Sequence, residues 1–315
     1  MTIVRTVLGD LPAERLGPTL PHEHLQATFV PHDAWRPKPG DRDAARARLL
    51  PLLLDLRQAG CSAFVDCTPA AMGRDPRLLR ALSEDSGLHI LANTGFYQPP
   101  WLPAWAAGAD ADRLAAHWIR EAREGLNDTD IRPGFVKIAL STRDEPVSPL
   151  QARILRAAIR VSRTCGLPIA AHTIGDRPLQ DALAILQEEG LPPDRFIWVH
   201  AGTGSPEVQE AALAAGIRIE LDMVAPETAD RDAERILELL RSPWHRRVLA
   251  SMDRGWHDPA RPDQEIRPYA WFFREFLPRL ARLGADEAMI RRLTVENPAE
   301  AFALRPGDGG GPESP

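Results

Sequence analysis

The chain has 315 residues, a formal net charge of −6 and a sequence pI of about 5.9. This length suits one large domain, and the acidic balance without a lysine- or arginine-rich cluster argues against a nucleic-acid partner. The sequence has no run of about 18 apolar residues and no basic leader with an apolar core, which argues against a membrane partner. The 3 cysteines form no paired framework, so we expect a reducing compartment and a cytoplasmic location.

The first predicted element is a short β-hairpin, with strands at residues 4–8 and 16–20 and a polar turn at residues 12–15. After it, apolar strand-like segments alternate with helical segments, several of which begin with a proline in the first turn. The predicted strands are residues 18–24, 61–66, 88–95, 134–140, 167–172, 195–200, 216–222 and 247–253. The predicted helices between them are residues 43–59, 76–86, 110–125, 149–165, 178–189, 206–215 and 230–240.

The last part of the chain is predicted to close the fold. We expect a long aromatic helix at residues 267–283 and short helices at 286–293 and 297–304, whereas residues 305–315 have no apolar residue to bury and are expected to be disordered. Strand followed by helix, repeated around a closed sheet, is the signature of the (β/α)8 or TIM barrel. We therefore predict an α/β protein in which residues 1–304 form one barrel domain, with the hairpin and the closing helices added to it.

Side chains that can bind metal ions lie at or near the C-terminal ends of five of these strands. Two imidazoles stand two residues apart in Pro-His-Glu-His, a spacing that directs both to the same side of a strand. The C-terminal strand ends of a parallel barrel face one mouth, where residues far apart in the sequence can meet. The candidate metal ligands are His22, His24, Lys137, His172, His200 and Asp253.

The motifs around these residues resemble those of the phosphotriesterase family of the amidohydrolase superfamily, which includes phosphotriesterase-like lactonases. They are Pro-His-Glu-His, Gly-Phe-Val-Lys, Ala-His-Thr, Val-His-Ala-Gly and Ser-Met-Asp, and the resemblance covers nearly the whole chain. It implies a homodimeric, binuclear metal hydrolase with a buried ion, an outer ion and a bridging hydroxide. The implied ligands are His22, His24 and Asp253 for the buried ion, His172 and His200 for the outer ion, and carboxylated Lys137 for the bridge.

The residue types agree with this chemistry. Imidazole and carboxylate ligands without thiolate favour zinc, with manganese, cobalt and iron as alternatives. A lysine ammonium cannot bind a metal ion, so Lys137 needs carbon dioxide to convert it to a carbamate. The alternative for this lysine is an ion pair with one of the core carboxylates Asp66, Glu220 and Asp222. Two ions sharing one water generate a hydroxide nucleophile, and Asp253 can accept the proton as it attacks, so Asp253 and Lys137 are the predicted catalytic residues.

The loops after the strands supply the candidates for binding a small-molecule substrate. Tyr97 and Trp256 are expected to form an aromatic wall over the metal ions, with packing of the loops on each other as the alternative. Met223 stands where the lactonases of the family carry an arginine, and Arg254 is the one basic residue directly after the eighth strand, which argues against a phosphorylated substrate. A lactone or carboxylic ester is the predicted substrate. Phosphotriester hydrolysis is the alternative, and a barrel that binds a ligand without turnover is the third hypothesis.

Two neighbours of these residues have structural interpretations. Glu23, between the two histidines, is expected to point away from the metal ions into the barrel wall and to form an ion pair with an arginine. His257 is close enough along the chain to reach a substrate, but a solvated loop residue is the favoured interpretation.

Overall fold

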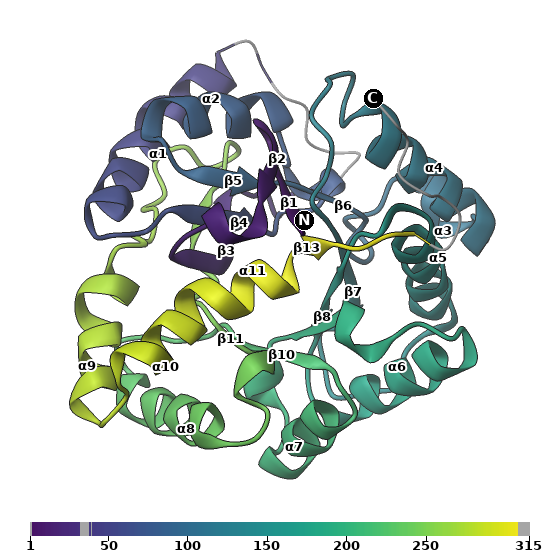
Figure 1. Cartoon of the computed structure of the whole chain (residues 1–315). Helices are drawn as coiled ribbons and strands as arrows, with labels where there is room; N and C mark the ends of the chain where they lie inside the picture. Colours follow the sequence, from purple (N-terminus) through teal and green to yellow (C-terminus); the bar gives the residue numbers. More distant parts are fainter. Residues whose placement is uncertain (1, 32–37, 39, 308–315) are drawn as a thin grey trace.

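The computed structural model describes residues 2–31, 38 and 40–307 and confirms the predicted barrel. Parallel strands form the central wall and helices surround it as an outer ring, as seen along the barrel axis in Figure 1. The barrel strands are β3 (Thr19–Gln26), β4 (Ala63–Asp66), β5 (His89–Leu91) with β6 (Asn93–Thr94), β7 (Phe135–Ser141), β8 (Ile169–Thr173), β9 (Phe196–Val199), β10 (Arg218–Leu221) and β11 (Val248–Ala250). Each overlaps the segment predicted for it.

The third strand of the barrel is divided in two at Ala92. Its first half, β5, pairs with β4, and its second half, β6, pairs with β7. The longer sheet has the order β11-β10-β9-β8-β7-β6 with parallel pairing throughout. Within it Lys137 stands opposite Ala170, and Ala139 stands opposite His172. This register brings the lysine and the histidine to the same end of the barrel.

Capping residues stand at the starts of several predicted helices. The Asp75 side chain accepts hydrogen bonds from two backbone N–H groups of α2 (Pro76–Ser86), and Ser148 with Gln151 forms a capping box at α5 (Pro149–Cys165). A cap of this kind stabilises a helix by about 1 kcal/mol. The other helices of the ring are α1 (Asp41–Gln58), α3 (Ala104–Ala107), α4 (Ala111–Glu124), α6 (Asp176–Glu188), α7 (Pro206–Ala214) and α8 (Ala229–Arg241). None of the helices in the described residues is long and apolar enough to cross a membrane.

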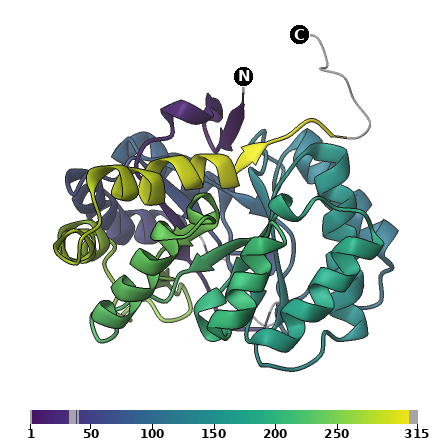
Figure 2. The same ribbon diagram turned by 60° about the horizontal axis from the view of Figure 1, so that its bottom comes forward.

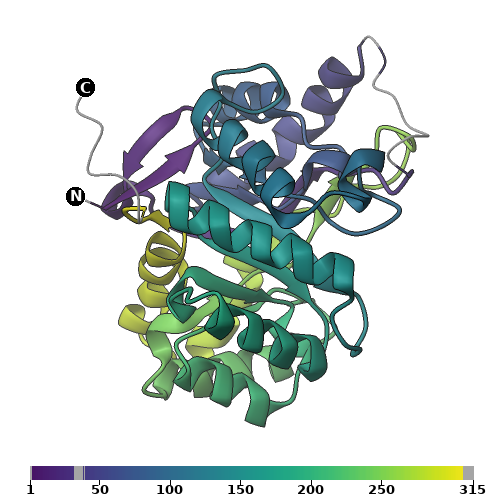
Figure 3. The ribbon, with the colours of Figure 1, turned by 90° about the vertical axis from the view of Figure 1, so that its right-hand side faces the viewer.

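Both ends of the chain cover the end of the barrel where the strands begin (Figures 2 and 3). β1 (Ile3–Thr6) pairs antiparallel with β2 (Gly9–Pro12) and with β13 (Ala303–Leu304). Beside them α11 (Asn297–Ala301) packs across the barrel, and the Asn297 amide donates to the carbonyls of His245 and Val248 at the start of β11. The loops that follow the strands are therefore left at the opposite end.

The predicted hairpin was wrong in its register. The turn lies at Val7 and Leu8, where the Thr6 hydroxyl donates to the Gly9 carbonyl and accepts from the Leu8 N–H. The second strand is therefore β2, not residues 16–20, and the polar residues predicted as the turn form a 3-10 turn (Ala13–Arg15). A threonine side chain that closes the turn locally is the signal that the prediction overlooked.

The C-terminal helices also differ from the prediction. The helix expected at residues 267–283 begins only at Trp271, because Tyr269 packs on the barrel and donates from its hydroxyl to the His24 carbonyl. It consists of a π-helical turn (Phe272–Phe276) followed by α9 (Leu277–Arg282). The two short helices form one run, in which a π-helical turn (Arg292–Glu296) joins α10 (Glu287–Arg291) to α11.

The segment expected to be disordered begins with contacts to the barrel. The Arg305 backbone N–H donates to the Gly166 carbonyl at 3.1 Å, and its guanidinium pairs with Asp194. Residues 308–315 lie outside the described residues, so the expectation for them stays a prediction.

An apolar layer fills the half of the barrel interior next to the chain ends. It is formed by inward-facing strand residues such as Phe135, Ile197 and Leu249, closed by Phe302, whose ring lies 5.3 Å from that of Phe135. Because side chains alternate along a strand, Phe135 and Lys137 of β7 face the same interior one layer apart. The polar layer that contains Lys137 thus lies on an apolar floor.

The barrel closes between its first and last strands through the segment after β11. β12 (Gly255–His257) pairs parallel with the end of β3, with Gly255 opposite His24 and His257 opposite Gln26. The His24 N–H donates to the Arg254 carbonyl at 2.9 Å, and the Asp253 N–H donates to the His22 carbonyl at 3.3 Å. We call this contact between β3 and residues 251–257 the closing seam.

Candidate metal centre

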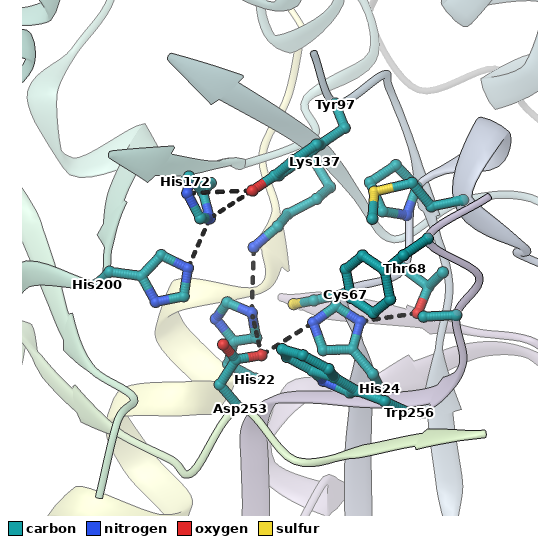
Figure 4. Close-up of a pocket in the computed structure, with 14 residues that line it drawn as sticks. His22, His24, Cys67, Thr68, Tyr97, Lys137, His172, His200, Asp253 and Trp256 are labelled. Carbon is teal, nitrogen blue, oxygen red and sulfur yellow. Dashed lines mark hydrogen bonds and ion pairs between the residues drawn. The ribbon is translucent and has the colours of Figure 1, made fainter. Parts of the chain in front are cut away.

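The predicted metal ligands all line one pocket at the end of the barrel where the strands end (Figure 4). The strands supply them in order: β3 carries His22 and His24, β7 carries Lys137, β8 carries His172, His200 follows β9, and Asp253 lies in the segment after β11. In Figure 4 the Lys137 side chain reaches between two groups, a pair of histidines on one side and two histidines with an aspartate on the other.

His22, His24 and Asp253 form the deeper group. Asp253 Oδ1 lies 3.1 Å from His24 Nε2 and 3.7 Å from His22 Nε2, and donor atoms of the three residues come within 4.8 Å of one another. Burial raises the pKa of Asp253, but the contact with His24 and the charge of His22 outweigh it and hold that pKa below its usual range. Oδ1 is buried without a well-directed hydrogen bond from the described residues. This arrangement leaves an anionic oxygen among imidazole nitrogens, which fits a bound cation.

His172 and His200 form the outer group. Their Nδ1 and Nε2 atoms lie 2.7 Å apart, and Lys137 Nζ lies 3.3 Å from His22 Nε2 in the deeper group. In the described part of the chain the structure records no ion pair between Lys137 and a carboxylate, so the alternative partners considered for it are not in contact. The lysine nitrogen is thus placed between the two groups.

Two buried carboxylates orient the imidazoles from behind. His22 Nδ1 lies 2.9 Å from Asp222 Oδ2 and 3.0 Å from Glu220 Oε2, and His200 Nδ1 lies 2.9 Å from Asp222 Oδ1. A carboxylate beside Nδ1 favours the tautomer in which Nδ1 carries the proton. The Nε2 lone pair is then presented to the pocket, as a metal ligand requires.

The surroundings keep the imidazoles of His22 and His172 neutral. Burial and the charge of Lys137 lower the pKa of His22 to about 3, against the opposing effect of Asp222. Burial and the charge of His200 lower the pKa of His172 well below its usual value. Near neutral pH both rings are therefore in the unprotonated form that binds metal ions.

Two of the six residues have a left-handed backbone, His200 with φ of 64° and Asp253 with φ of 52°. This conformation costs about 1–2 kcal/mol for an ordinary residue, although histidine and aspartate adopt it more readily than most. Neither residue lies in a regular strand, so the turn of the backbone directs each side chain back over the barrel. Contacts from the surrounding structure must hold both residues in place.

An apolar pocket of about 80 Å³ lies over the cluster, and both aromatic candidates line it. Tyr97 Oη lies 3.1 Å from His172 Nε2, and the Trp256 ring meets His24 edge-on at 5.6 Å between centroids. Burial, followed by the charge of Asp253, raises the pKa of Tyr97, so its hydroxyl keeps its proton near neutral pH. Both aromatic rings therefore lie beside the cluster, and their contact with a substrate stays a prediction.

Phe29 is a pocket residue that the sequence analysis missed. Its ring lies 5.2 Å from the Trp256 ring and 6.2 Å from the Trp101 ring, and 42% of the residue is exposed. The available signal was its position shortly after the first barrel strand, because the loops after barrel strands build active sites. Together Phe29, Tyr97 and Trp256 give the pocket an aromatic rim.

The other two candidate substrate contacts need correction. Met223 is 56% exposed and lines a neighbouring cavity of about 700 Å³, together with Leu221 and Val224. The Arg254 guanidinium lies over the Trp271 ring at 5.8 Å. Neither residue lines the pocket above the cluster in the described part of the chain. Alternation explains the position of Met223, because the preceding residue, Asp222, faces the barrel interior.

The environments expected for Glu23 and His257 were also wrong. Glu23 does point away from the cluster, but its carboxylate accepts hydrogen bonds from the Ser251 hydroxyl and from the backbone N–H groups of Met252 and Arg254, with no arginine side chain paired to it among the described residues. Burial raises the pKa of Glu23 to about 8, and these hydrogen bonds oppose the rise. His257 is only 3% exposed because it belongs to β12 in the closing seam.

Sequence reasoning named Glu220 and Asp222 only as alternative partners of Lys137 and did not identify them, or Thr68, as residues that orient the ligands. Glu220 and Asp222 flank a leucine at the end of β10, and this alternation places both carboxylates on the interior face, a signal that was available. Thr68 follows β4, and its Oγ1 lies 2.8 Å from His24 Nδ1 and 3.2 Å from an Asp66 carboxylate oxygen. No local sequence pattern distinguishes such a threonine from any other loop residue.

The fold and the site define the class of this protein: a (β/α)8 barrel whose mouth gathers imidazoles, a lysine and a carboxylate able to bind metal ions. The model of the phosphotriesterase family matches residues 2–302. The chain belongs to this family of binuclear metal-dependent hydrolases, which includes enzymes that act on ester bonds.

Individual relatives carry different activities. The chain is 26% identical to the aryldialkylphosphatase of Saccharolobus solfataricus, covering 93% of this chain and 97% of that protein. It is also 26% identical to the N-acetyltaurine hydrolase of Tetraodon nigroviridis, covering 96% and 98%. A solved structure matches with a TM-score of 0.81 and 28% identity, covering 96% of this chain and 100% of that one. It comes from the molecular engineering of organophosphate hydrolysis activity from a weak promiscuous lactonase template. The homodimer and the cytoplasmic location expected from the sequence stay predictions.

Proposed function

We propose that this protein hydrolyses a lactone or a carboxylic ester with two metal ions bound at the cluster. The observation that carries the proposal is the small apolar pocket directly over the ligands, which has an aromatic rim and contains no arginine among its described lining residues. Such a pocket suits an uncharged or weakly charged substrate whose apolar portion packs against the aromatic rim.

The proposal extends to the metal ions and their ligands. The donor set contains imidazole and carboxylate without thiolate, which favours zinc over manganese, cobalt or iron. Lys137 lies between the two groups of ligands, and in carboxylated form its two oxygens would reach both ions. The proposed ligands are His22, His24 and Asp253 for the buried ion, His172 and His200 for the outer ion, and Lys137 for both.

The protein side chains then have separate tasks. When bound, the two ions supply an acidified water and polarise the scissile carbonyl. Asp253 is ionised and has an oxygen without a good hydrogen bond, so it can accept the proton of the attacking water. Tyr97, held beside His172, can donate its hydroxyl hydrogen to a substrate oxygen. Phe29 and Trp256 exclude bulk water from the apolar side of the pocket.

The shape of the substrate also favours a carbonyl over a phosphoryl centre. A phosphotriester carries three ester substituents arranged around a tetrahedral phosphorus, and each needs its own space. A lactone presents a planar carbonyl whose two substituents are joined in one ring, so it needs less space beside the aromatic rim.

The metal-loaded protein should therefore hydrolyse γ- and δ-lactones and aryl esters with a higher kcat/KM than an aryl dialkyl phosphate. All substrates are compared at one pH, with protein stripped by chelator as the control. A phosphotriester preferred by more than about tenfold, equivalent to about 1.4 kcal/mol of transition-state stabilisation, would contradict the proposed substrate class.

Protein purified without chelator should contain about two divalent ions per chain, because the side chains fill two coordination spheres with a shared bridge. Elemental analysis measures the content. Chelator treatment should lower the melting temperature, since ions that bind only the folded state stabilise it. One ion or fewer per chain, even after supplementation with metal and bicarbonate, would show that the site is not binuclear.

Phosphotriester hydrolysis is the second candidate function. The similarity to an aryldialkylphosphatase over 93% of the chain favours it. Both candidates use the same ligands and the same proton acceptor, so only the substrate comparison separates them.

A further inference from the structure

Glu23 stands between two of the proposed metal ligands and makes contacts with the residues around a third. Its side chain is fully buried, on the face of β3 opposite to His22 and His24. The carboxylate accepts hydrogen bonds from Ser251 Oγ at 2.8 Å, from Met252 N at 3.0 Å and from Arg254 N at 2.7 Å. These three donors bracket Asp253 in the sequence.

The segment that Glu23 contacts has a strained backbone. Asp253 has φ of 52° and Trp256 has φ of 68°, so two residues with side chains lie in the left-handed region. Gly255 between them approaches β3 so closely that a Cβ on it would lie 2.0 Å from the His24 carbonyl oxygen. Conformations of this kind persist only where the surroundings hold them.

We propose that Glu23 is a positioning residue that fixes the segment around Asp253 and thereby sets the position of the Asp253 carboxylate over the cluster. The Asp253 side chain can reach His22 and His24 only if its backbone keeps the left-handed turn. Glu23 holds the residue before it and the residue after it by their N–H groups. The inference rests on the proposed role of Asp253 as metal ligand and proton acceptor.

The pattern of donors requires a side chain with two acceptor oxygens at position 23. The Ser251 hydroxyl accepts from the His22 N–H at 3.2 Å, so its own hydrogen is available for Glu23. Each of the three neighbours of Glu23 therefore offers a hydrogen, and the two side-chain oxygens of Glu23 accept them, Oε1 from Ser251 and Met252 and Oε2 from Arg254. Glutamine has nearly the same shape but brings an NH2 group, which would face an N–H donor and leave it unpaired.

The test compares Glu23→Gln with Glu121→Gln. Glu121 is also buried, at 8% exposure, and accepts from Arg74 at 2.9 Å, but it lies on α4 and not in the catalytic pocket. For both variants the affinity for Co²⁺ is measured by competition with a chelator, together with the visible absorption spectrum of the Co²⁺-loaded protein. Loss of a group that orients a metal ligand typically weakens metal binding or activity by about 10- to 100-fold.

Glu23→Gln should show this loss and an altered spectrum, with a lower kcat and little change in KM, whereas Glu121→Gln should match the wild type in all of them. Wild-type affinity and spectrum in Glu23→Gln, or an equal loss in Glu121→Gln, would overturn the inference. If Glu23→Gln does not fold, Ser251→Ala removes one of the three donors and should change affinity and spectrum in the same direction by a smaller factor. Wild-type values in Ser251→Ala would then overturn the inference.

The metal measurements need no substrate and so distinguish this inference from the proposed function. A wild-type protein that hydrolyses none of the lactones and esters would contradict the proposed function. Weaker Co²⁺ binding specific to Glu23→Gln would still support the positioning role in that case.

Discussion

Asp253→Asn should keep the fold and much of the bound metal but lower kcat by about 100- to 10,000-fold, the usual cost of removing a general base. The amide still offers an oxygen to a metal ion, but it cannot accept a proton. In the wild type Asp253 Oδ1 lies 3.1 Å from His24 Nε2, and the amide oxygen of asparagine can take the same position. The change therefore alters the chemistry and leaves the geometry of the ligand group in place.

The measurement is kcat and metal content side by side, with Asp258→Asn as the control. Asp258 is buried in the same loop and accepts from the Ala260 N–H at 2.9 Å, but it does not line the pocket. Asp258→Asn should keep kcat near the wild-type value. An unchanged kcat in Asp253→Asn would assign the proton transfer to another residue.

Lys137→Ala should lose both metal and activity. In the wild type the lysine nitrogen lies between the deeper and the outer groups, and no other described residue of β7 presents a ligand there. Short carboxylic acids, which resemble a carbamate, should restore part of the activity by occupying the space that the side chain leaves. Lys38→Ala is the matched control, since Lys38 is the only other lysine of the chain.

Elemental analysis and a titration of Lys137→Ala with acetate or formate test this prediction, and mass spectrometry or a crystal structure of the wild type tests for the carboxyl group on Nζ. A wild-type protein that binds two metal ions with a bare ammonium at Lys137 would refute the bridging role. Full metal content in Lys137→Ala would refute it as well.

Periodicity predicted the barrel because each strand is a short apolar run between helices, several of which begin with a capping residue. Pro76 and Pro149 stand in the first turn of helices that start where predicted. The errors lie at both ends of the chain, where tertiary contacts override local pattern. Tyr269 interrupts a helical pattern by bonding to the barrel, and Thr6 closes a hairpin turn earlier than the polar residues suggested.

The sequence predicted the residues of the candidate site, but not the contacts that hold them in place. The six proposed ligands needed only their places at strand ends, because a parallel barrel brings strand ends to one mouth. Strand-end position does not predict which residues of the following loops line the pocket. Met223 falls outside the pocket lining because it follows an inward-facing aspartate, and Phe29 enters it from a loop without regular periodicity. The sequence predicted an arginine partner for Glu23. It could not predict the actual donors, because backbone N–H groups of a distant segment have no signature in the local sequence.

The closing seam makes the metal centre depend on a completed chain. The deeper group of the cluster joins β3, near the start of the protein, to the segment after β11. The hydrogen bond from the His22 N–H to Ser251 spans 229 residues of sequence. At about 5–20 residues per second of synthesis, the histidines leave the ribosome well before their aspartate. Until then a nascent chain has only part of the proposed site. Metal uptake by the proposed ligands of the deeper group would therefore be a late event of biosynthesis, and an ion bound there would fasten the last strand of the barrel to the first.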